Sequence, residues 1–195
     1  AGGAGTYYFD ELNFVAGGGG GGGGGTVAGL PIDFDTAGVT YTLTGFGGAE
    51  DATVAAGVAG ANGSVARVVK SATAELWAGT TVSTGANQSI GTIPFTATAR
   101  SMTLRVRVVA AGIVVRLKVE DAADNTHTVE TEATTTVANA WETLTFNFAN
   151  QAAGTAALNL AFTYNKASVF FAFGTTGAAG GAGTYYFDEL NFVAG

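Results

Sequence analysis

The amino-acid sequence predicts an all-β protein, an antiparallel β-sandwich of the jelly-roll type, and three observations lead to this fold class. From Leu30 onward, short segments of alternating apolar and polar residues are rich in Val, Thr, Ile, Tyr and Phe. Turns made of Gly, Asn, Asp and Ala separate these segments at the regular spacing of sandwiches. No window of a dozen residues keeps the period of a helix.

The expected strands follow one another along a single domain. A tight turn is expected at Asn62-Gly63, and the Ala-rich stretch 150–160 is expected to be a loop. The strands are expected at residues 31–35, 39–46, 64–71, 76–83, 101–110, 113–121, 127–137, 141–149, 169–173 and 184–193.

Two neighbouring strands, 101–110 and 113–121, can be interpreted residue by residue. Their apolar positions alternate, and these are Leu104, Val106, Val108, Ile113, Val115, Leu117 and Val119. A two-residue turn at Ala111-Gly112 predicts a hairpin in which Arg107 lies opposite Arg116. The same register sets Arg105 opposite Lys118, and like charges directly opposite each other are unfavourable.

The next strand, 127–137, offers compensating charges. A turn around residues 122–126 sets Lys118 opposite Glu130 and Arg116 opposite Glu132. The sequence therefore predicts a charged ladder on the outer face of a sheet. Exposed ion pairs contribute only about 0–1 kcal/mol each, so the ladder specifies strand register more than stability.

The composition of the chain argues against several classes of function. The chain has 195 residues, a net charge of −7, a charged fraction of 12% and no cysteine. Its length suffices for one core, and its acidity argues against nucleic acid as a partner. The apolar runs are too short for a membrane helix, no leader peptide opens the chain, and the lack of cysteine excludes disulfides.

An exact repeat is the most unusual feature of the sequence. Residues 1–17 and 179–195 both read AGGAGTYYFDELNFVAG, and a glycine run, Gly17 to Gly25, follows the first copy. The first copy is the tail of a preceding module in a tandem array, a donor strand for a neighbouring subunit, or an artefact in which glycines stand for unread residues. These alternatives stay open.

Both leading explanations join modules end to end. Residues 1–17 are then a copy of the terminal strand, residues 18–29 a glycine-rich linker, and residues 30–195 the jelly-roll sandwich. The side chains expected to form the inter-module strand are Tyr7, Tyr8, Phe9, Leu12 and Phe14.

Several segments resemble a known family. The segments PIDFD, VVKSATAELWAGTTV, VVRLKVED, TVANAWETLTFNF and YYFDEL are similar to β-sandwich carbohydrate-binding modules of secreted bacterial proteins, and similar domains occur in surface arrays and phage fibres. The resemblance covers residues 30–193. It implies an extracellular jelly roll with a structural Ca²⁺ between the first and last strands, held by Asp33 or Asp35 and by Asp188.

The resemblance also implies sugar binding on exposed aromatic rings. The predicted charged face carries no ring, and Trp77 and Trp141 are both expected in the core. If a glycan binds, the expected residues are Trp77, Arg105, Arg107, Arg116 and Glu130, whose cations would favour an acidic polysaccharide. The alternative is a solvated face of salt bridges.

No reaction is indicated. Glu130 and Glu132 are about 7 Å apart on one strand face, a spacing that a glycosidase could use, but both have predicted cationic partners. His127 is the only histidine. We therefore expect no enzyme, but a structural repeat module of an extracellular filament, stalk or adhesin array whose partners are copies of itself. The alternative is a carbohydrate-binding module attached to a polysaccharide-degrading enzyme.

Overall fold

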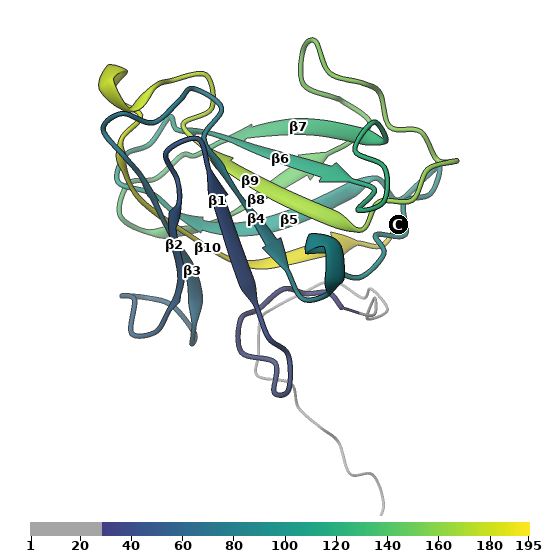
Figure 1. Cartoon of the computed structure of the whole chain (residues 1–195), viewed down its shortest axis with the longest axis horizontal. Helices are drawn as coiled ribbons and strands as arrows, with labels where there is room; N and C mark the ends of the chain where they lie inside the picture. The colour runs from purple at the N-terminus through teal and green to yellow at the C-terminus, as the bar shows by residue number, and fades with distance from the viewer. Residues whose placement is uncertain (1–28) are drawn as a thin grey trace, which may run out of the picture.

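The computed structural model describes residues 29–195 and shows a β-sandwich of two five-stranded antiparallel sheets (Figure 1). The all-β, jelly-roll prediction is confirmed. The first sheet has the order β1-β4-β9-β6-β7 and the second the order β2-β3-β10-β5-β8. In the part of the chain described, no helix is long and apolar enough to cross a membrane.

The strands are short, except the last. Those of the first sheet, in spatial order, are β1 (Thr42–Phe46), β4 (Gly79–Ser83), β9 (Lys166–Phe171), β6 (Val114–Glu120) and β7 (Thr128–Thr134). Those of the second sheet are β2 (Asp51–Ala55), β3 (Val65–Lys70), β10 (Gly183–Val193), β5 (Ser101–Arg107) and β8 (Trp141–Asn147). The short 3₁₀ helices are η1 (Ala86–Gln88) and η2 (Gly177–Ala179).

The core lies between the sheets because alternate residues of each strand point inward. Leu104 and Val106 of β5, Leu117 and Val119 of β6, and Phe187 of β10 are all completely buried. Full burial of such a side chain stabilises the fold by about 1.5–3 kcal/mol. The remaining alternate positions of each strand therefore face outward, where a ligand can reach them.

Two details differ from the expected elements. Segment 31–35 is not a strand, although Ile32 forms an isolated bridge with Leu190 of β10. The edge strand β2 was not expected; it is short, and its residues are exposed or half-buried, with none in the core. The other expected strands all correspond to strands of the structure.

The predicted hairpin of 101–110 with 113–121 is wrong. β5 pairs with β10 and β8, whereas β6 pairs with β9 and β7, so Arg105 and Arg107 lie in the other sheet from Arg116 and Lys118. Alternation shows only which side chains face the core, and strands on opposite sides of one core have the same pattern. The segment between β5 and β6 crosses from one sheet to the other.

The predicted register of β6 and β7 is confirmed. Arg116 lies opposite Glu132, and Lys118 lies opposite Glu130. The inter-module strand with Tyr7, Tyr8, Phe9, Leu12 and Phe14, and the glycine run, lie outside the described residues.

Candidate functional site

The outer face of the β1-β4-β9-β6-β7 sheet carries a groove with a volume of about 580 Å³. This size lies within the usual range of about 300–1,000 Å³ for ligand sites. Its lining combines aromatic rings, hydroxyls and charged groups: Thr44, Phe46, Trp77, Thr81, Gln88, Arg116, Lys118, Glu120, Glu130, Thr155, Lys166, Ser168, Phe170 and Phe173.

A row of polar side chains crosses the floor of the groove. Cross-strand partners point to the same face of a sheet, and the register joins Thr44, Thr81, Ser168, Lys118 and Glu130 over all five strands. The hydroxyls of Thr81 and Ser168 are 2.8 Å apart and hydrogen-bonded. The groove floor thus offers donors and acceptors along a line.

Aromatic rings form one end of the groove. Trp77, in the turn before β4, is 49% exposed, and its ring stacks on Phe46 at 6.2 Å with an interplanar angle of 18°. Phe46 contacts Phe170 edge to face, and Phe170 contacts Phe173 in the same way. The cluster presents the Trp77 ring to solvent on a support of other rings.

Two glycines make this cluster possible. A Cβ at Gly79 would lie 2.5 Å from Cδ1 of Phe170 and 2.9 Å from Cζ of Phe46, so the two rings meet across a position without a side chain. Gly47 has φ +68°, and a Cβ there would lie 2.8 Å from Cζ3 of Trp77. The Trp77 ring therefore lies directly against the backbone, which restricts its orientation.

Arg116 joins the aromatic end to the polar row. It donates from Nη1 to Glu130 at 2.8 Å and from Nε to Glu132 at 2.8 Å. Its guanidinium carbon lies 3.5 Å above the ring centre of Phe173, in cation–π geometry. These contacts fix the guanidinium plane beside the rings.

The other charges of the groove are paired as well. Lys118 lies 2.8 Å from one Glu120 oxygen, and Lys166 lies 3.8 Å from the other. The cations Arg116, Lys118 and Lys166 therefore face an equal number of carboxylates, Glu120, Glu130 and Glu132. The face is polar yet balanced in charge.

The structure divides the residues predicted to bind a glycan. Trp77, Arg116 and Glu130 lie together in the groove, whereas Arg105 and Arg107 belong to β5 of the other sheet. The expectation that Trp77 is a core residue is wrong, since its ring is 49% exposed. The rings beneath it were missed, because consecutive buried residues in β9 hide the alternation that would place Phe170 outward.

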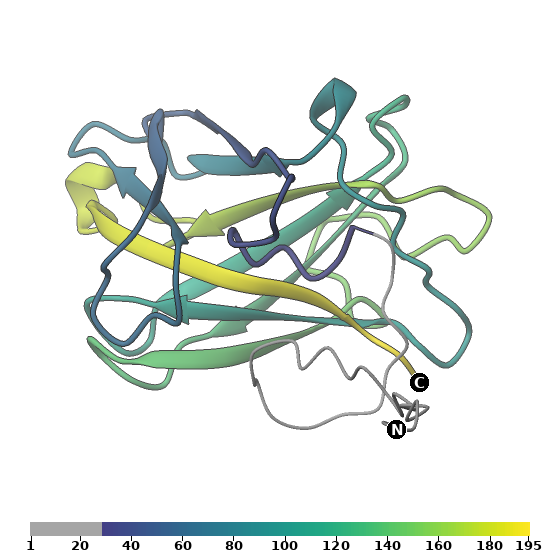
Figure 2. The ribbon, with the colours of Figure 1, turned by 90° about the horizontal axis from the view of Figure 1, so that it is seen from below.

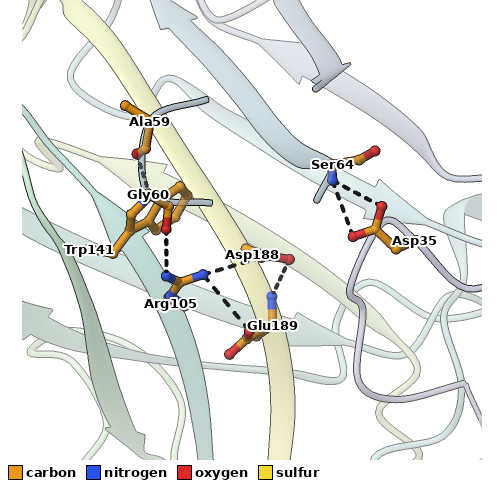
Figure 3. A network of polar contacts seen from close by, with 8 residues as sticks. All are labelled: Asp35, Ala59, Gly60, Ser64, Arg105, Trp141, Asp188 and Glu189. Atoms are coloured by element: carbon orange, nitrogen blue, oxygen red, sulfur yellow. Dashed lines mark hydrogen bonds and ion pairs between the residues drawn. The ribbon is translucent and has the colours of Figure 1, made fainter. Parts of the chain in front are cut away.

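Trp141 also departs from its expected place in the core. It is only half-buried, at the start of β8, and its indole N–H donates to the carbonyl of Ala59 at 3.0 Å. The guanidinium of Arg105 lies 4.7 Å from the ring centre and donates to the carbonyl of Gly60 at 2.9 Å (Figure 3). Both residues are therefore held by a loop, away from the groove.

Asp188 is a buried carboxylate on the opposite side of the sandwich from the groove. Within the described chain, its one hydrogen bond comes from the backbone N–H of Glu189, at 2.8 Å, and Nη1 of Arg105 lies 3.8 Å away (Figure 3). Burial raises the pKa of Asp188 to about 7. The negative charges of Glu189 and, least of all, Asp35 act in the same direction, while the N–H of Glu189 and the charge of Arg105 act against it. Asp188 is thus a buried carboxylate with one hydrogen-bond donor and one guanidinium beside it.

The two candidate aspartates of the first segment have different surroundings. Asp33 accepts hydrogen bonds from its own turn, from the N–H of Asp35 and of Thr36, and from the hydroxyl of Tyr41. Asp35 accepts from the N–H of Ser64, and its charge is one of two carboxylate charges that act on Asp188, the other being that of Glu189. Asp33 is therefore held by its own turn and by Tyr41, whereas Asp35 is exposed and is held by the backbone of Ser64.

The aspartates fit a cation only in part. Among residues 29–195, no group of three or more His, Asp or Glu side chains could hold a metal ion. Ca²⁺ takes about six to eight oxygen ligands, so backbone carbonyls would have to complete a site built on Asp35 and Asp188. The observation that favours a cation here is the burial of Asp188, whose carboxylate accepts one hydrogen bond within the described residues.

The sequence matches no protein-family model and no curated protein. Solved structures, however, share its fold. A family 11 carbohydrate-binding module from Clostridium thermocellum, in complex with a β-1,3-1,4-mixed-linked tetrasaccharide, aligns with a TM-score of 0.51 and 14% identity over 83% of this chain and 92% of that chain. The family 11 module of a cellulosomal cellulase of the same organism aligns with a TM-score of 0.50 and 14% identity over 84% and 92%. The fold is that of β-sandwich carbohydrate-binding modules.

Proposed function

We propose that this chain is a non-catalytic carbohydrate-binding module that holds a neutral polysaccharide in the groove of the first sheet. The observation that carries the proposal is the exposed Trp77 ring, supported by Phe46, at the end of a polar groove. A pyranose presents an apolar C–H face, which packs on an aromatic ring, and hydroxyls that hydrogen-bond at its edges. Trp77 would provide the ring, and the row from Thr44 to Glu130 the polar contacts.

The balance of charge favours a neutral sugar over an acidic one. Each cation of the groove already has a carboxylate partner. A uronate would have to compete with these partners, whereas a hydroxyl can bridge a donor and an acceptor without separating them. The arginines of the sequence suggested an acidic polysaccharide, but the paired charges favour a neutral one. We propose a mixed-linkage β-glucan, because the family 11 module of similar fold is in complex with such a tetrasaccharide.

The same pairing favours binding over catalysis. Glu130 and Glu132 both accept hydrogen bonds from Arg116, so their carboxylates are engaged in the protein, whereas a glycosidase needs one carboxyl group free to protonate the leaving oxygen of the sugar. In this proposal they orient the arginine and the sugar. The setting we infer is extracellular, beside a polysaccharide-degrading enzyme.

Replacement of Trp77 tests the proposal. We expect Trp77→Ala to weaken binding to mixed-linkage β-glucan about 10- to 100-fold, because the variant loses the apolar contact of one large ring. Affinity gel electrophoresis with the polysaccharide in the gel measures this effect. The matched control is Leu76→Ala, since Leu76 is a similarly exposed apolar neighbour, 43% accessible, outside the groove lining.

Each outcome of this experiment is decisive. Retention of the wild-type protein by the neutral glucan, with loss in Trp77→Ala alone, supports the proposal. Equal loss in Leu76→Ala contradicts the role of the ring. Retention on polygalacturonate and not on the glucan contradicts the inference from the balanced charges.

We further propose that Asp35 and Asp188 hold a structural Ca²⁺. When bound, the ion would neutralise the buried carboxylate of Asp188 together with the exposed carboxylate of Asp35. Asp188 anchors the site on β10, and the Ile32–Leu190 bridge places the segment containing Asp35 along the same strand. The ion would thereby tie the start of the domain to its last strand.

Addition of Ca²⁺ after chelator treatment is expected to raise the melting temperature by about 5–10 °C at saturation. Differential scanning calorimetry measures the shift, with Mg²⁺ as the comparison ion. Asp188→Asn should lose the shift, and the exposed-strand control Asp51→Asn should keep it. No shift in the wild-type protein, or an unchanged shift in Asp188→Asn, contradicts the site.

The predicted role as a structural module of an end-to-end array depends on other observations than carbohydrate binding does. It rests on the sequence repeat, whose first copy lies outside the described residues, and the related folds favour carbohydrate binding instead. A carbohydrate-binding module can also be one unit of a surface array, so the two functions are compatible.

A further inference from the structure

β10 is the central strand of the second sheet. It pairs with β3 on one side and β5 on the other, and it is the longest strand in the described chain (Figure 2). Its inward side chains, Tyr185, Phe187, Leu190 and Phe192, are all buried. A sandwich without this strand would lose two ladders of hydrogen bonds and part of its core.

Residues 5–15 have the same sequence as β10. Both read GTYYFDELNFV, so each hydrogen bond and each core contact that β10 makes is also available to residues 5–15. Only one strand fits between β3 and β5. The chain therefore carries two segments with the same affinity for a single position.

The described part of the chain begins close to that position. Ile32 and Leu190 exchange two backbone hydrogen bonds, of 2.9 and 3.1 Å, so the start of the described chain runs beside the C-terminal half of β10 (Figure 2). If residues 5–15 took the place of β10, Val15 would occupy the position of Val193. Residues 16–29 would then connect to Leu30, and a coil of 14 residues spans about 20 Å.

We propose that residues 5–15 are an alternative occupant of the β10 position within the same chain. Exchange replaces every contact of β10 by an identical one, so its free-energy cost comes only from the connections at each end. The resident strand is favoured by the preceding loop, where the N–H of Gly177 donates to Ala74 and the carbonyl of Thr175 accepts from Lys70. Tethering gives the first copy a high effective concentration.

Exchange has a consequence beyond carbohydrate binding. It releases residues 183–193, whose sequence fits the same position in a second copy of the chain. The repeat thereby provides a route to end-to-end association without any additional binding surface. Strand addition of this kind uses main-chain hydrogen bonds for affinity and buried side chains for register.

Substitutions in the two copies test the proposal in the full-length chain. Phe187 is completely buried, and Phe9 is its counterpart in the first copy. An aspartate in place of either removes that copy from the core, because an unpaired buried charge is strongly destabilising. We expect Phe187→Asp and Phe9→Asp each to keep a cooperative thermal transition within about 10 °C of the wild type.

The double variant Phe9→Asp, Phe187→Asp should lose the transition altogether, as seen by near-ultraviolet circular dichroism. This loss shows that each copy rescues the other. If Phe187→Asp alone is as unfolded as the double variant, the first copy cannot fill the position and the proposal is overturned. Neither result depends on sugar binding, so failure here and failure of the proposed function are distinguishable.

Engineered cysteines identify the occupant. Asn191 lies opposite Thr103 in the register of β10 and β5, and the chain has no cysteine of its own. In the Phe187→Asp background, Asn13→Cys with Thr103→Cys should form a disulfide within one chain. Asn191→Cys with Thr103→Cys in the Phe9→Asp background is the matched control. Disulfide-linked dimers, or no disulfide in the first pair alone, contradict the assignment to the same chain.

Discussion

Replacing Lys70 by methionine is expected to lower the free energy of unfolding by about 3 kcal/mol, the largest effect that we expect from a single substitution outside the apolar core. Lys70 ends β3 with only 2% of its surface exposed. Its ammonium donates to the carbonyls of Phe171 at 3.2 Å, Ala172 at 3.1 Å and Thr175 at 2.8 Å. Methionine has a similar length but leaves these acceptors without their donor.

The position of these carbonyls explains the size of the effect. They belong to the end of β9 and the turn after it, so one side chain of the second sheet ties down the first. Burial lowers the pKa of Lys70, while three acceptors match the three N–H bonds of the charged form. Removal of the amine therefore loosens the connection between the two sheets.

Lys166→Met is the matched control for Lys70→Met. Lys166 is also in a strand, but its one ion pair among residues 29–195, at 3.8 Å, is to Glu120, which keeps Lys118 as a closer partner. We expect a loss below about 1 kcal/mol. Thermal denaturation should show a melting temperature about 10 °C lower for Lys70→Met and nearly unchanged for Lys166→Met. Equal shifts in the two variants contradict the role of Lys70.

The fold class could be predicted from the sequence because alternation is a local property. It identified the strands and the inward residues of β5 and β6. It could not assign them to sheets, since Leu104 and Leu117 face the same core from opposite sides. The pairing of β6 with β7 was predictable for a different reason: a short turn and complementary charges, Lys118 with Glu130, define one register.

The candidate site was predictable only in its charged half. Arg116 and Glu130 alternate with core residues along their strands, so their outward orientation follows from the pattern. The aromatic half is assembled from the end of β1, the turn before β4 and the end of β9. Phe46, Trp77 and Phe170 meet there through a tertiary arrangement around Gly79, which no local pattern reports.

Arg116 connects these two halves, and its replacement by lysine is the second large effect that we expect. Lysine keeps the charge but cannot donate to Glu130 and Glu132 from one rigid plane, nor lie flat on Phe173. We expect Arg116→Lys to lower the free energy of unfolding by about 2 kcal/mol, since the Arg116 side chain is only 12% exposed. We also expect affinity for mixed-linkage β-glucan to fall at least about 10-fold, because the donor beside the rings moves.

The matched control for Arg116→Lys is Arg67→Lys. Arg67 pairs with Asp51 at 3.1 Å on the outer face of the other sheet, where the two side chains are 33% and 59% exposed. Such a pair contributes about 0–1 kcal/mol, so the variant should unfold like the wild type and keep its affinity for the glucan. Chemical denaturation measures the first quantity and isothermal titration calorimetry the second. If Arg116→Lys loses stability but keeps its affinity for the glucan, Arg116 stabilises the fold and does not take part in binding. If Arg67→Lys loses affinity, the glucan binds on the other sheet.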